Sequence, residues 1–340
     1  MKVGFFGGKF LPLHQGHLFM IYQAFMKMDK LYVVLSSSEK YDRMVCKRDG
    51  IKYMPVQERL SWLGALLAKH FGNLVPIIHI VDRPEDDEHD WEYGAKQVKA
   101  QIIEQITHIF SSEPTYSTHF SKYYPEAKHV VVDPERKSYP ISSTDIRKDP
   151  WMNWQYLTEE GKGFLCKKVA VVGTESCGKS TLVSKLAKKY ATTSTAEVGR
   201  SYCDQYSNQL TESLFNDIAM QHWLVQKDMA AISNQVTFID SDAIITQYYL
   251  KMYLGKESPL IEEVIKLQEY DLVLYLEPDV PWVADGLRFA GNEAVRLRNN
   301  RELNNMYVDR GVTFYDLRGN YAERLKRAVE CVELLLQGKI

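Results

Sequence analysis

The residues with the clearest chemical pattern lie at positions 173–181, which read GTESCGKST. They fit the spacing G-x-x-x-x-G-K-[ST], in which glycines let consecutive backbone N–H groups surround phosphate oxygens. Residues 167–172, which read as a buried strand, precede the motif and a helical pattern follows it, and this is the context that the motif requires. The stretch therefore predicts a loop that binds nucleotide phosphates through Gly173, Glu175, Ser176, Cys177, Gly178, Lys179, Ser180 and Thr181.

Three side chains of this loop have distinct expected roles. Lys179 should reach the β and γ phosphates of ATP, and Ser180 should hold Mg²⁺. Cys177 lies beside a helix N-terminus and Lys179, both of which would favour its thiolate. We therefore expect a thiol reagent to block this site and Mg-ATP to protect it. The alternative is that Cys177 is a small, inert filler of the loop.

Two carboxylates lie at the end of a second predicted buried strand, residues 236–239. A carboxylate at the carboxyl end of such a strand organises Mg²⁺ or acts as a base in phosphate-loop enzymes. Asp240 and Asp242 are therefore candidate functional residues, with a capped turn as the alternative. Together with Ser180, Asp240 is the expected metal ligand.

Other charged residues in the second half fit supporting roles. Glu197 and Arg200 fit either a substrate site or a plain surface pair. Arg288 opens an arginine-rich stretch, and such a stretch suits a lid that brings positive charge to a transferring phosphate. The remaining arginines of this stretch are Arg296, Arg298 and Arg301.

The first half of the chain carries a second glycine loop, directly after an apolar run at residues 3–6. This loop contains Gly7, Gly8, Lys9 and Phe10. His14 and His17 follow where a helix is expected to begin, so their imidazoles lie on one face of it. They fit metal ligands, phosphate contacts or structural histidines. Lys9 either adds positive charge to this site or is a solvated lysine.

A polar segment at residues 141–147, ISSTDIR, complements the histidines. Its hydroxyl groups and an expected helix start would hold phosphate oxygens, and an arginine supplies a forked cation. The residues concerned are Ser142, Ser143, Thr144 and Arg147.

The hydrophobic pattern predicts strands and helices that alternate along both halves. Such alternation indicates open parallel sheets, in which ligands bind beyond the carboxyl ends of the strands. Strands are expected at residues 3–6, 31–35, 77–81, 106–110, 130–132, 167–172, 236–239 and 271–276, and helices at 18–28, 57–71 and 321–336. A polar, turn-forming linker is expected between residues 156 and 167, which gives domains 1–157 and 158–340.

Composition excludes several classes of protein. The net charge of −2 gives no general attraction to nucleic acid or anionic membranes. Five scattered cysteines without a C-x-x-C pair argue against a disulfide scaffold or a zinc site. The N-terminus reaches glycine too early for a signal peptide, and there is no apolar run long enough to span a membrane. We therefore expect a cytoplasmic enzyme.

The motifs carry a resemblance to a known family. H-x-G-H with I-S-S-T-x-I-R resembles the nucleotidyltransferase superfamily, which has a Rossmann-like sheet and transfers adenylyl or cytidylyl groups. This resemblance implies that His14 and His17 contact the phosphates of ATP. It also implies ATP binding by Gly7, Gly8, Lys9, Phe10, Ser142, Ser143, Thr144 and Arg147.

The whole chain resembles the bifunctional NadR-type family of nicotinamide-mononucleotide adenylyltransferases and ribosylnicotinamide kinases. The fold implied is a Rossmann-like nucleotidyltransferase domain followed by a P-loop kinase domain, both α/β with parallel sheets. The kinase would make nicotinamide mononucleotide (NMN) from nicotinamide riboside and ATP, and the transferase would convert NMN and ATP to NAD and pyrophosphate. The implied catalytic residues are His14, His17, Lys179, Asp240 and Arg288. Substrate contacts are implied for Trp91, Glu113, Asp133, Arg136, Glu197, Arg200 and Asp242, although Trp91 equally fits a core or surface tryptophan.

Two rival interpretations remain open at this point. A fusion of pantetheine-phosphate adenylyltransferase with dephospho-coenzyme A kinase would show the same two loop types in the same order. The second interpretation is a regulatory protein that binds ATP or NAD as a signal without converting it. Enterobacterial relatives carry an N-terminal helix-turn-helix, whereas the first strand here is expected from about residue 2, so no specific DNA binding is expected. A homo-oligomer is compatible with the sequence, which does not fix the oligomeric state.

Overall fold

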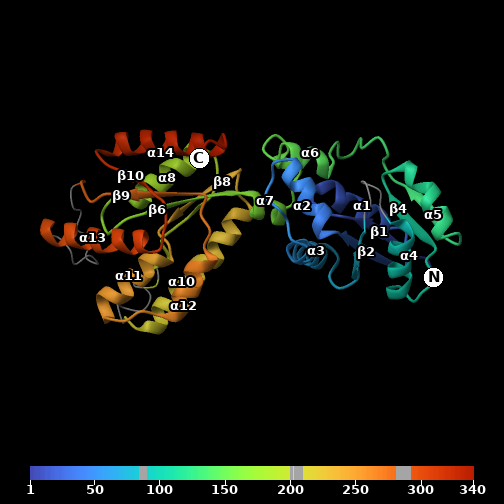
Figure 1. The fold of residues 1–340 in the computed structure, drawn as a ribbon, viewed down its shortest axis with the longest axis horizontal. Coiled ribbons are helices and arrows are strands. Elements are labelled where there is room, and N and C mark those ends of the chain that lie inside the picture. Colours follow the sequence, from blue (N-terminus) through green and yellow to red (C-terminus); the bar gives the residue numbers. More distant parts are fainter. Residues whose placement is uncertain (84–89, 200–201, 203–209, 281–291) are drawn as a thin grey trace. The chain divides into compact units, whose positions relative to one another are not determined.

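A computed structural model of the protein describes residues 1–83, 90–199, 202, 210–280 and 292–340. The chain forms two compact units, Met1–Gly161 and Lys162–Ile340, shown as a ribbon in Figure 1. The segment expected to be a turn-forming linker is instead a helix, α7 (Glu159–Leu165). Glu159 and Glu160 lie in its first turn, where negative charge stabilises a helix, and this offsets the low helix propensity of two glycines.

The N-terminal unit is built on a parallel sheet with the strand order β3-β2-β1-β4-β5. Its strands are β1 (Val3–Gly8), β2 (Lys30–Ser37), β3 (Ile77–Val81), β4 (His108–Ser111) and β5 (Lys128–Val131). Its helices are α1 (Gln15–Phe25), α2 (Glu39–Arg48), α3 (Val56–Phe71), α4 (Trp91–Gln101), α5 (Ser117–Tyr123) and α6 (Ser143–Lys148), with short 3₁₀ turns at Pro114–Tyr116 and Trp154–Tyr156.

Helices cover both faces of this sheet. Alternate strand residues such as Phe5 and Val34 form a buried cluster with Val98 of α4 and Phe120 of α5. Helices α1 and α3 also pack against the strands. The chain leaves β1 toward β2 on one side and reaches β4 on the other, so the order of the strands reverses beside β1. Ligands of open parallel sheets bind at such a reversal, which is where the histidine loop begins.

The second unit repeats this architecture with the strand order β10-β9-β6-β8-β7, again all parallel. Its strands are β6 (Lys167–Val172), β7 (Ser194–Thr195), β8 (Val236–Asp240), β9 (Leu272–Leu276) and β10 (Tyr315–Leu317). Its helices are α8 (Lys179–Lys189), α10 (Glu212–Ala231), α11 (Ala243–Leu254), α12 (Pro259–Leu267), α13 (Glu293–Asp309) and α14 (Tyr321–Leu336).

The central strand β6 is buried on both faces over its last four residues, which explains why Val169–Val172 are all apolar. Val169 and Val171 face a cluster formed with α8 and α14, whereas Ala170 and Val172 face a cluster formed with α11 and α13. The phosphate-loop motif follows β6, and Asp240 ends the neighbouring strand β8. The parallel sheet therefore brings the two motifs to one edge.

The predicted fold of two parallel α/β domains is confirmed. Besides α7, the structure differs from the expected elements at β10, a strand of three residues that was not predicted, and at α1, which spans Gln15–Phe25 and not 18–28 and has His14 as its N-cap. No membrane-spanning helix is found in the part of the chain that the structure describes.

Candidate active sites

The two histidines of the first loop lie against each other. The ring centroids of His14 and His17 are 3.7 Å apart, and the ring planes differ by 29°. Phe10 contacts His17 edge-on, with 4.8 Å between centroids. Gly16 makes the arrangement possible, since a Cβ at this position would come within 3.0 Å of the His14 ring. The glycine of H-x-G-H therefore lets the first histidine pack closely against the start of the helix.

Both imidazoles are neutral at physiological pH. Burial lowers the pKa of His14 to about 3, with a smaller effect of the positive charge of Arg136. Burial also holds the pKa of His17 well below its ordinary value, and the charges of His14 and Arg136 lower it further. Two positively charged rings in this stacked contact would repel each other, so the stacked geometry is consistent with two neutral imidazoles.

The hydrogen bonds of His17 define which of its nitrogens carries the proton. The backbone N–H of His14 donates to Nδ1 of His17, with 3.3 Å between the nitrogens. In a neutral ring the proton then lies on Nε2, which is free to act as a donor. Nδ1 of His14 is buried and has no hydrogen-bond partner among the described residues. The pair therefore offers hydrogen-bonding capacity to a ligand, which fits phosphate contacts better than a purely structural role.

The polar segment at residues 141–147, which follows β5, contacts the histidine loop. Ser142 caps α6 and forms a reciprocal capping box with Asp145. The hydroxyl of Ser143 donates to the carbonyl oxygen of Pro12 at 3.2 Å, which ties the segment to the histidine loop. Arg147 is buried, and its guanidinium already has hydrogen-bond partners within the protein. Its nitrogens contact Asp49 at 2.7 Å, the carbonyl oxygen of Leu11 at 2.8 Å and the hydroxyl of Thr144 at 3.1 Å.

These contacts give Arg147 a role in holding the loop, and direct phosphate binding by Arg147 stays a prediction. Arg136 is more available to a ligand. It forms an ion pair with Glu113 at 2.6 Å, and the two side chains are 34% and 40% exposed. Its charge also acts on both histidines, so this pair belongs to the same site.

The other two expected substrate contacts have clear local partners. Asp133 accepts backbone N–H groups from Lys137 and Ser138 at 2.9 and 2.8 Å, and these bonds lower the pKa of its carboxyl. Trp91 stacks on His119, with ring centroids 4.5 Å apart and planes 7° apart, and contacts Phe120 edge-on. The expectation that Trp91 packs with neighbouring side chains therefore holds, and its contact with nicotinamide stays a prediction.

The phosphate loop of the second unit has the backbone that its glycines permit. Gly173 has φ of +141°, and a Cβ there would lie 2.6 Å from the carbonyl oxygen of Leu276. Gly178 has φ of +93°, and a Cβ there would lie 2.9 Å from the ring of Tyr321. A side chain at Gly173 would clash with backbone, and a side chain at Gly178 would be strained by the positive φ. The motif glycines are therefore fixed by neighbours far away in the sequence as well as by loop conformation.

Lys179 lies inside the loop. Its Nζ donates to the carbonyl oxygens of Gly173 and Thr174 at 3.0 and 2.9 Å. Burial alone would lower the pKa of Lys179, but attraction to the groups around it, including Glu197 and Asp240, outweighs burial and raises it. The ammonium therefore stays charged at neutral pH, as phosphate binding requires.

The surroundings of Cys177 oppose the activated thiolate that the sequence predicted and favour the alternative of an inert filler. Its side chain is fully buried and its thiol donates to the carbonyl oxygen of Thr174 at 2.9 Å. Burial raises the pKa of the thiol, and the positive charges of Lys179 and Arg324 offset this only in part. The activated thiolate is disfavoured because the side chain points into the core under the loop.

We accordingly expect Cys177 to react slowly with thiol reagents in the folded protein. Labelling with iodoacetamide at pH 8, followed by peptide mass spectrometry, should give a rate that approaches that of free cysteine only after denaturation in urea. Thiols that are neutral and inaccessible react slowly because the thiolate is the nucleophile. Rapid labelling of Cys177 that Mg-ATP suppresses would restore the original expectation.

Asp240 is positioned as a ligand for a cation. It is 1% exposed, and burial raises its pKa, opposed by the charge of Lys179 and by a hydrogen bond with Ser180. Glu197 adds a negative charge to the same environment and raises the pKa further. A buried carboxylate next to a hydroxyl is a set of hard oxygen donors of the kind that Mg²⁺ prefers. Ser180 and Asp240 therefore fit a magnesium ion, although no cluster of three metal-binding side chains occurs among the described residues.

For Asp242, the structure agrees with the alternative expectation, a capped turn. It is the N-cap of α11, where its Oδ1 accepts the N–H of Ile245 at 3.0 Å and the hydroxyl of Tyr307 at 2.8 Å. Burial raises its pKa to about 6. These contacts explain its position without a ligand, and its contact with ribose stays a prediction that they do not support.

The buried charge of Asp242 predicts a dependence of stability on pH. Since the folded protein binds this proton more tightly than the unfolded chain, its stabilising effect is full below about pH 4 and is lost as the pH rises through about 6. The shift corresponds to roughly 3 kcal/mol between pH 4 and 8. Asp242→Asn keeps both accepted hydrogen bonds and removes the charge, so its urea midpoint should exceed that of the wild type at pH 8 and approach it at pH 4.5.

Asp228→Asn on the exposed face of α10 is the matched control for this measurement. It should leave the pH profile of stability unchanged. Parallel profiles for the wild type and Asp242→Asn would show that the carboxyl of Asp242 does not carry the effect.

A buried arginine that the sequence reasoning missed supports the phosphate loop. Arg324 of α14 is 1% exposed and donates to the carbonyl oxygens of Cys177 and Glu277, and it pairs with Asp279. It thereby ties the loop to the end of β9. A sequence signal existed, because Arg324 lies four residues before Ala328 on the apolar stripe of the last helix.

A cavity of about 150 Å³ opens beside the phosphate loop. It lies between the loop, α11 and α13, and it is lined by Thr174, Glu175, Tyr248, Tyr249, Tyr253 and Arg298, among others. The hydroxyl of Tyr253 donates to Glu175 at 3.4 Å. The cavity is thus aromatic on one side and adjoins the phosphate loop on the other. Two expected site residues, Arg200 and Arg288, lie outside the described residues.

Family models match each unit separately. A cytidylyltransferase-like family model matches residues 5–149, and an AAA domain model matches residues 168–324. Both matches agree with the two nucleotide loops described above.

Similar proteins cover nearly the whole chain. The trifunctional NAD biosynthesis/regulator protein NadR of Salmonella typhimurium is 33% identical over 98% of this chain and 83% of its own length, and the same values apply to that of Escherichia coli. A crystal structure of NadR protein in complex with NR has a TM-score of 0.78 at 22% identity and covers 98% of this chain and 95% of the other. A NadR structure in complex with NAD and AMP-PNP has a TM-score of 0.76 at 23% identity and covers 100% of this chain and 97% of the other.

Proposed function

The chain belongs to the NadR family, as its motifs predicted, and on this premise we propose that it makes NAD from nicotinamide riboside in two ATP-dependent steps. The second unit phosphorylates the riboside to NMN. The first unit then transfers the adenylyl group of a second ATP to NMN. The observation that carries the proposal is the neutral histidine pair of one unit together with the charged lysine loop of the other, each at the carboxyl edge of its own sheet.

In the first unit, a phosphate oxygen of NMN attacks the α-phosphorus of ATP, and the bond to the β-phosphate breaks to release pyrophosphate. A phosphate monoester is largely ionised at neutral pH, so the attack needs no strong base. Nε2–H of His17 is placed to donate to the α-phosphate as negative charge develops there. His14 and Arg136 supply further donors to the phosphates, with the loop from Gly7 to Phe10 and the segment from Ser142 to Arg147 around them.

In the second unit, the 5′-hydroxyl of the riboside attacks the γ-phosphorus of ATP and ADP leaves. The loop N–H groups and Lys179 hold the phosphates, and Asp240 accepts the proton of the hydroxyl or orders the metal site. Ser180 and Asp240 would hold Mg²⁺, which supplies charge neutralisation at the phosphates when bound. Glu197, Arg200 and Arg288 are proposed to support this site.

The aromatic cavity is the proposed place of the riboside. The pyridinium ring of nicotinamide riboside is a delocalised cation, and tyrosine rings attract such cations. Glu175 adds negative charge at the end of the cavity nearest the phosphate loop. The position of the cavity next to the loop would bring the 5′-hydroxyl toward the γ-phosphate.

The proposal is tested by product analysis with purified protein, ATP and Mg²⁺. Nicotinamide riboside should yield NMN and ADP followed by NAD, and NMN should yield NAD and pyrophosphate. Conversion of phosphopantetheine in place of both would instead support the coenzyme A fusion. Absence of any turnover at millimolar substrates, with ATP still bound, would support the sensing regulator.

A further inference from the structure

Lys9, the cation directly after the double glycine of β1, is held by two carboxylates. Its Nζ lies 3.2 Å from Oδ2 of Asp82 and 3.7 Å from Oδ1 of Asp42. The Lys9 side chain is only 19% exposed, and its ammonium lies 4.9 Å from the ring centroid of Tyr41. The sequence left open a solvated lysine, and these contacts exclude it.

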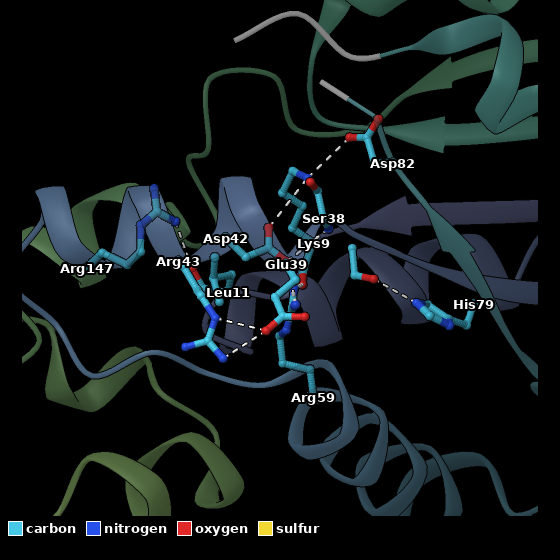
Figure 2. A network of polar contacts seen from close by, with 11 residues as sticks. Lys9, Leu11, Ser38, Glu39, Asp42, Arg43, Arg59, His79, Asp82 and Arg147 are labelled. Carbon is cyan, nitrogen blue, oxygen red and sulfur yellow. Dashed lines mark hydrogen bonds and ion pairs between the residues drawn. The ribbon is translucent and has the colours of Figure 1, made fainter. Parts of the chain in front are cut away.

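A buried arginine holds the same residue from the other side. Arg59 of α3 is fully buried, and its Nη1 donates to the backbone carbonyl oxygen of Lys9 at 2.7 Å. Its Nη2 pairs with Oδ2 of Asp42 at 2.5 Å. Figure 2 shows Lys9 between Asp42 and Asp82, together with Arg59 of the same polar network. One side chain therefore fixes the backbone of Lys9 and also the carboxylate that faces its ammonium.

Stability alone is a weak reason for this arrangement. Both Arg59 and Asp42 are 0% exposed. Burying two charges costs desolvation that their attraction only roughly offsets, and apolar residues of similar volume are often as stable. The pair does, however, bring together three segments distant in the sequence: the glycine loop, α2 and α3. Lys9 contacts both members of the pair, so this connection acts most directly on the position of Lys9.

A lysine needs such support to stabilise charge on a reacting phosphate. Its four-carbon chain is flexible, and ordering it at the moment of reaction has an entropic cost. Charge that is already oriented before reaction acts without this cost. We propose that Arg59 and Asp42 are positioning residues of the adenylyl-transfer site, which fix the backbone and the ammonium of Lys9 for contact with the triphosphate. This inference rests on the function proposed above for the first unit.

The first test compares two arginine-to-lysine changes in the full-length chain. Arg59→Lys keeps the charge but cannot reach Lys9 and Asp42 together, so kcat for adenylyl transfer to NMN should fall about 10- to 100-fold. Arg43→Lys is the control. Arg43 lies on α2 and pairs with Glu39 at 2.9 Å, but its side chain is 58% exposed. The rate of riboside phosphorylation by the second unit serves as an internal standard and should be unchanged in both variants.

A second test separates positioning from stability. The double variant Arg59→Met with Asp42→Asn removes both buried charges, so its thermal midpoint should recover relative to either single variant. Asp42 also accepts the N–H of Ser38 at 3.2 Å, and the amide oxygen introduced by Asp42→Asn can accept the same bond without a charge. If the pair positions Lys9, adenylyl transfer stays low in this stable variant. Full recovery of kcat together with stability would overturn the proposal.

A third test asks whether the effect passes through Lys9. In a double-mutant cycle, Lys9→Ala and Lys9→Ala with Arg59→Lys should have the same kcat, because contacting residues that act together are not additive. Multiplying effects would show that Arg59 acts elsewhere, and wild-type kcat in Arg59→Lys would refute the inference. A wild-type protein that phosphorylates riboside but transfers no adenylyl group would refute the proposed function of the first unit itself.

Discussion

Lys179→Ala should abolish phosphorylation of nicotinamide riboside while adenylyl transfer to supplied NMN persists. The lysine is the charged group inside the phosphate loop, where it donates to the carbonyl oxygens of Gly173 and Thr174. Its charge is needed at the transferring phosphate, so we expect kcat to fall by about 10³-fold or more. Chromatography of both reactions, each started with its own substrate, gives the two rates.

Lys188→Ala is the matched control, because Lys188 lies on the same helix α8 and is exposed. It should retain both activities. Loss of both activities in Lys179→Ala, with an unchanged circular dichroism spectrum, would mean that the two units share a site or are coupled. The assignment of one reaction to each unit would then be wrong.

His17→Ala should lower kcat for adenylyl transfer by about 10²- to 10³-fold, with little change in the KM for NMN. A donor aimed at charge that develops on the α-phosphate acts mainly in the transition state. Nδ1 of His17 accepts the backbone N–H of His14, so Nε2–H is the donor that the alanine variant loses. His17→Gln places an amide N–H near the same position and should retain part of the rate.

The histidine test has internal and external controls. Riboside phosphorylation should continue, so that His14→Ala combined with His17→Ala accumulates NMN and ADP from riboside and ATP without NAD. His70→Ala removes an exposed histidine that contacts the hydroxyl of Tyr22, and it should leave both rates unchanged. A raised KM with unchanged kcat in His17→Ala would make this histidine a plain binding group.

The sequence alone determined the elements whose signal is local. The pattern of β6 predicted a strand, and the glycines of the following motif predicted a tight loop; the strand is present, and Gly173 and Gly178 have positive φ values. H-x-G-H likewise predicted two histidines on one face at a helix start, and the rings are stacked there. These features depend on spacing within a few residues, so reading the chain in order suffices to find them.

The tertiary structure alone decided the protonation and the supports of the sites. Cys177 and Asp242 have raised pKa values because they are buried by helices far along the chain, and no local pattern measures burial. Arg324 reaches the carbonyl of Cys177 across 147 positions of sequence, and Arg59 reaches that of Lys9 across 50. Such contacts follow from the order of strands in a parallel sheet and from the helices that connect them. Local spacing therefore predicted which groups would bind phosphate, whereas long-range packing decided which are charged and how firmly they are held.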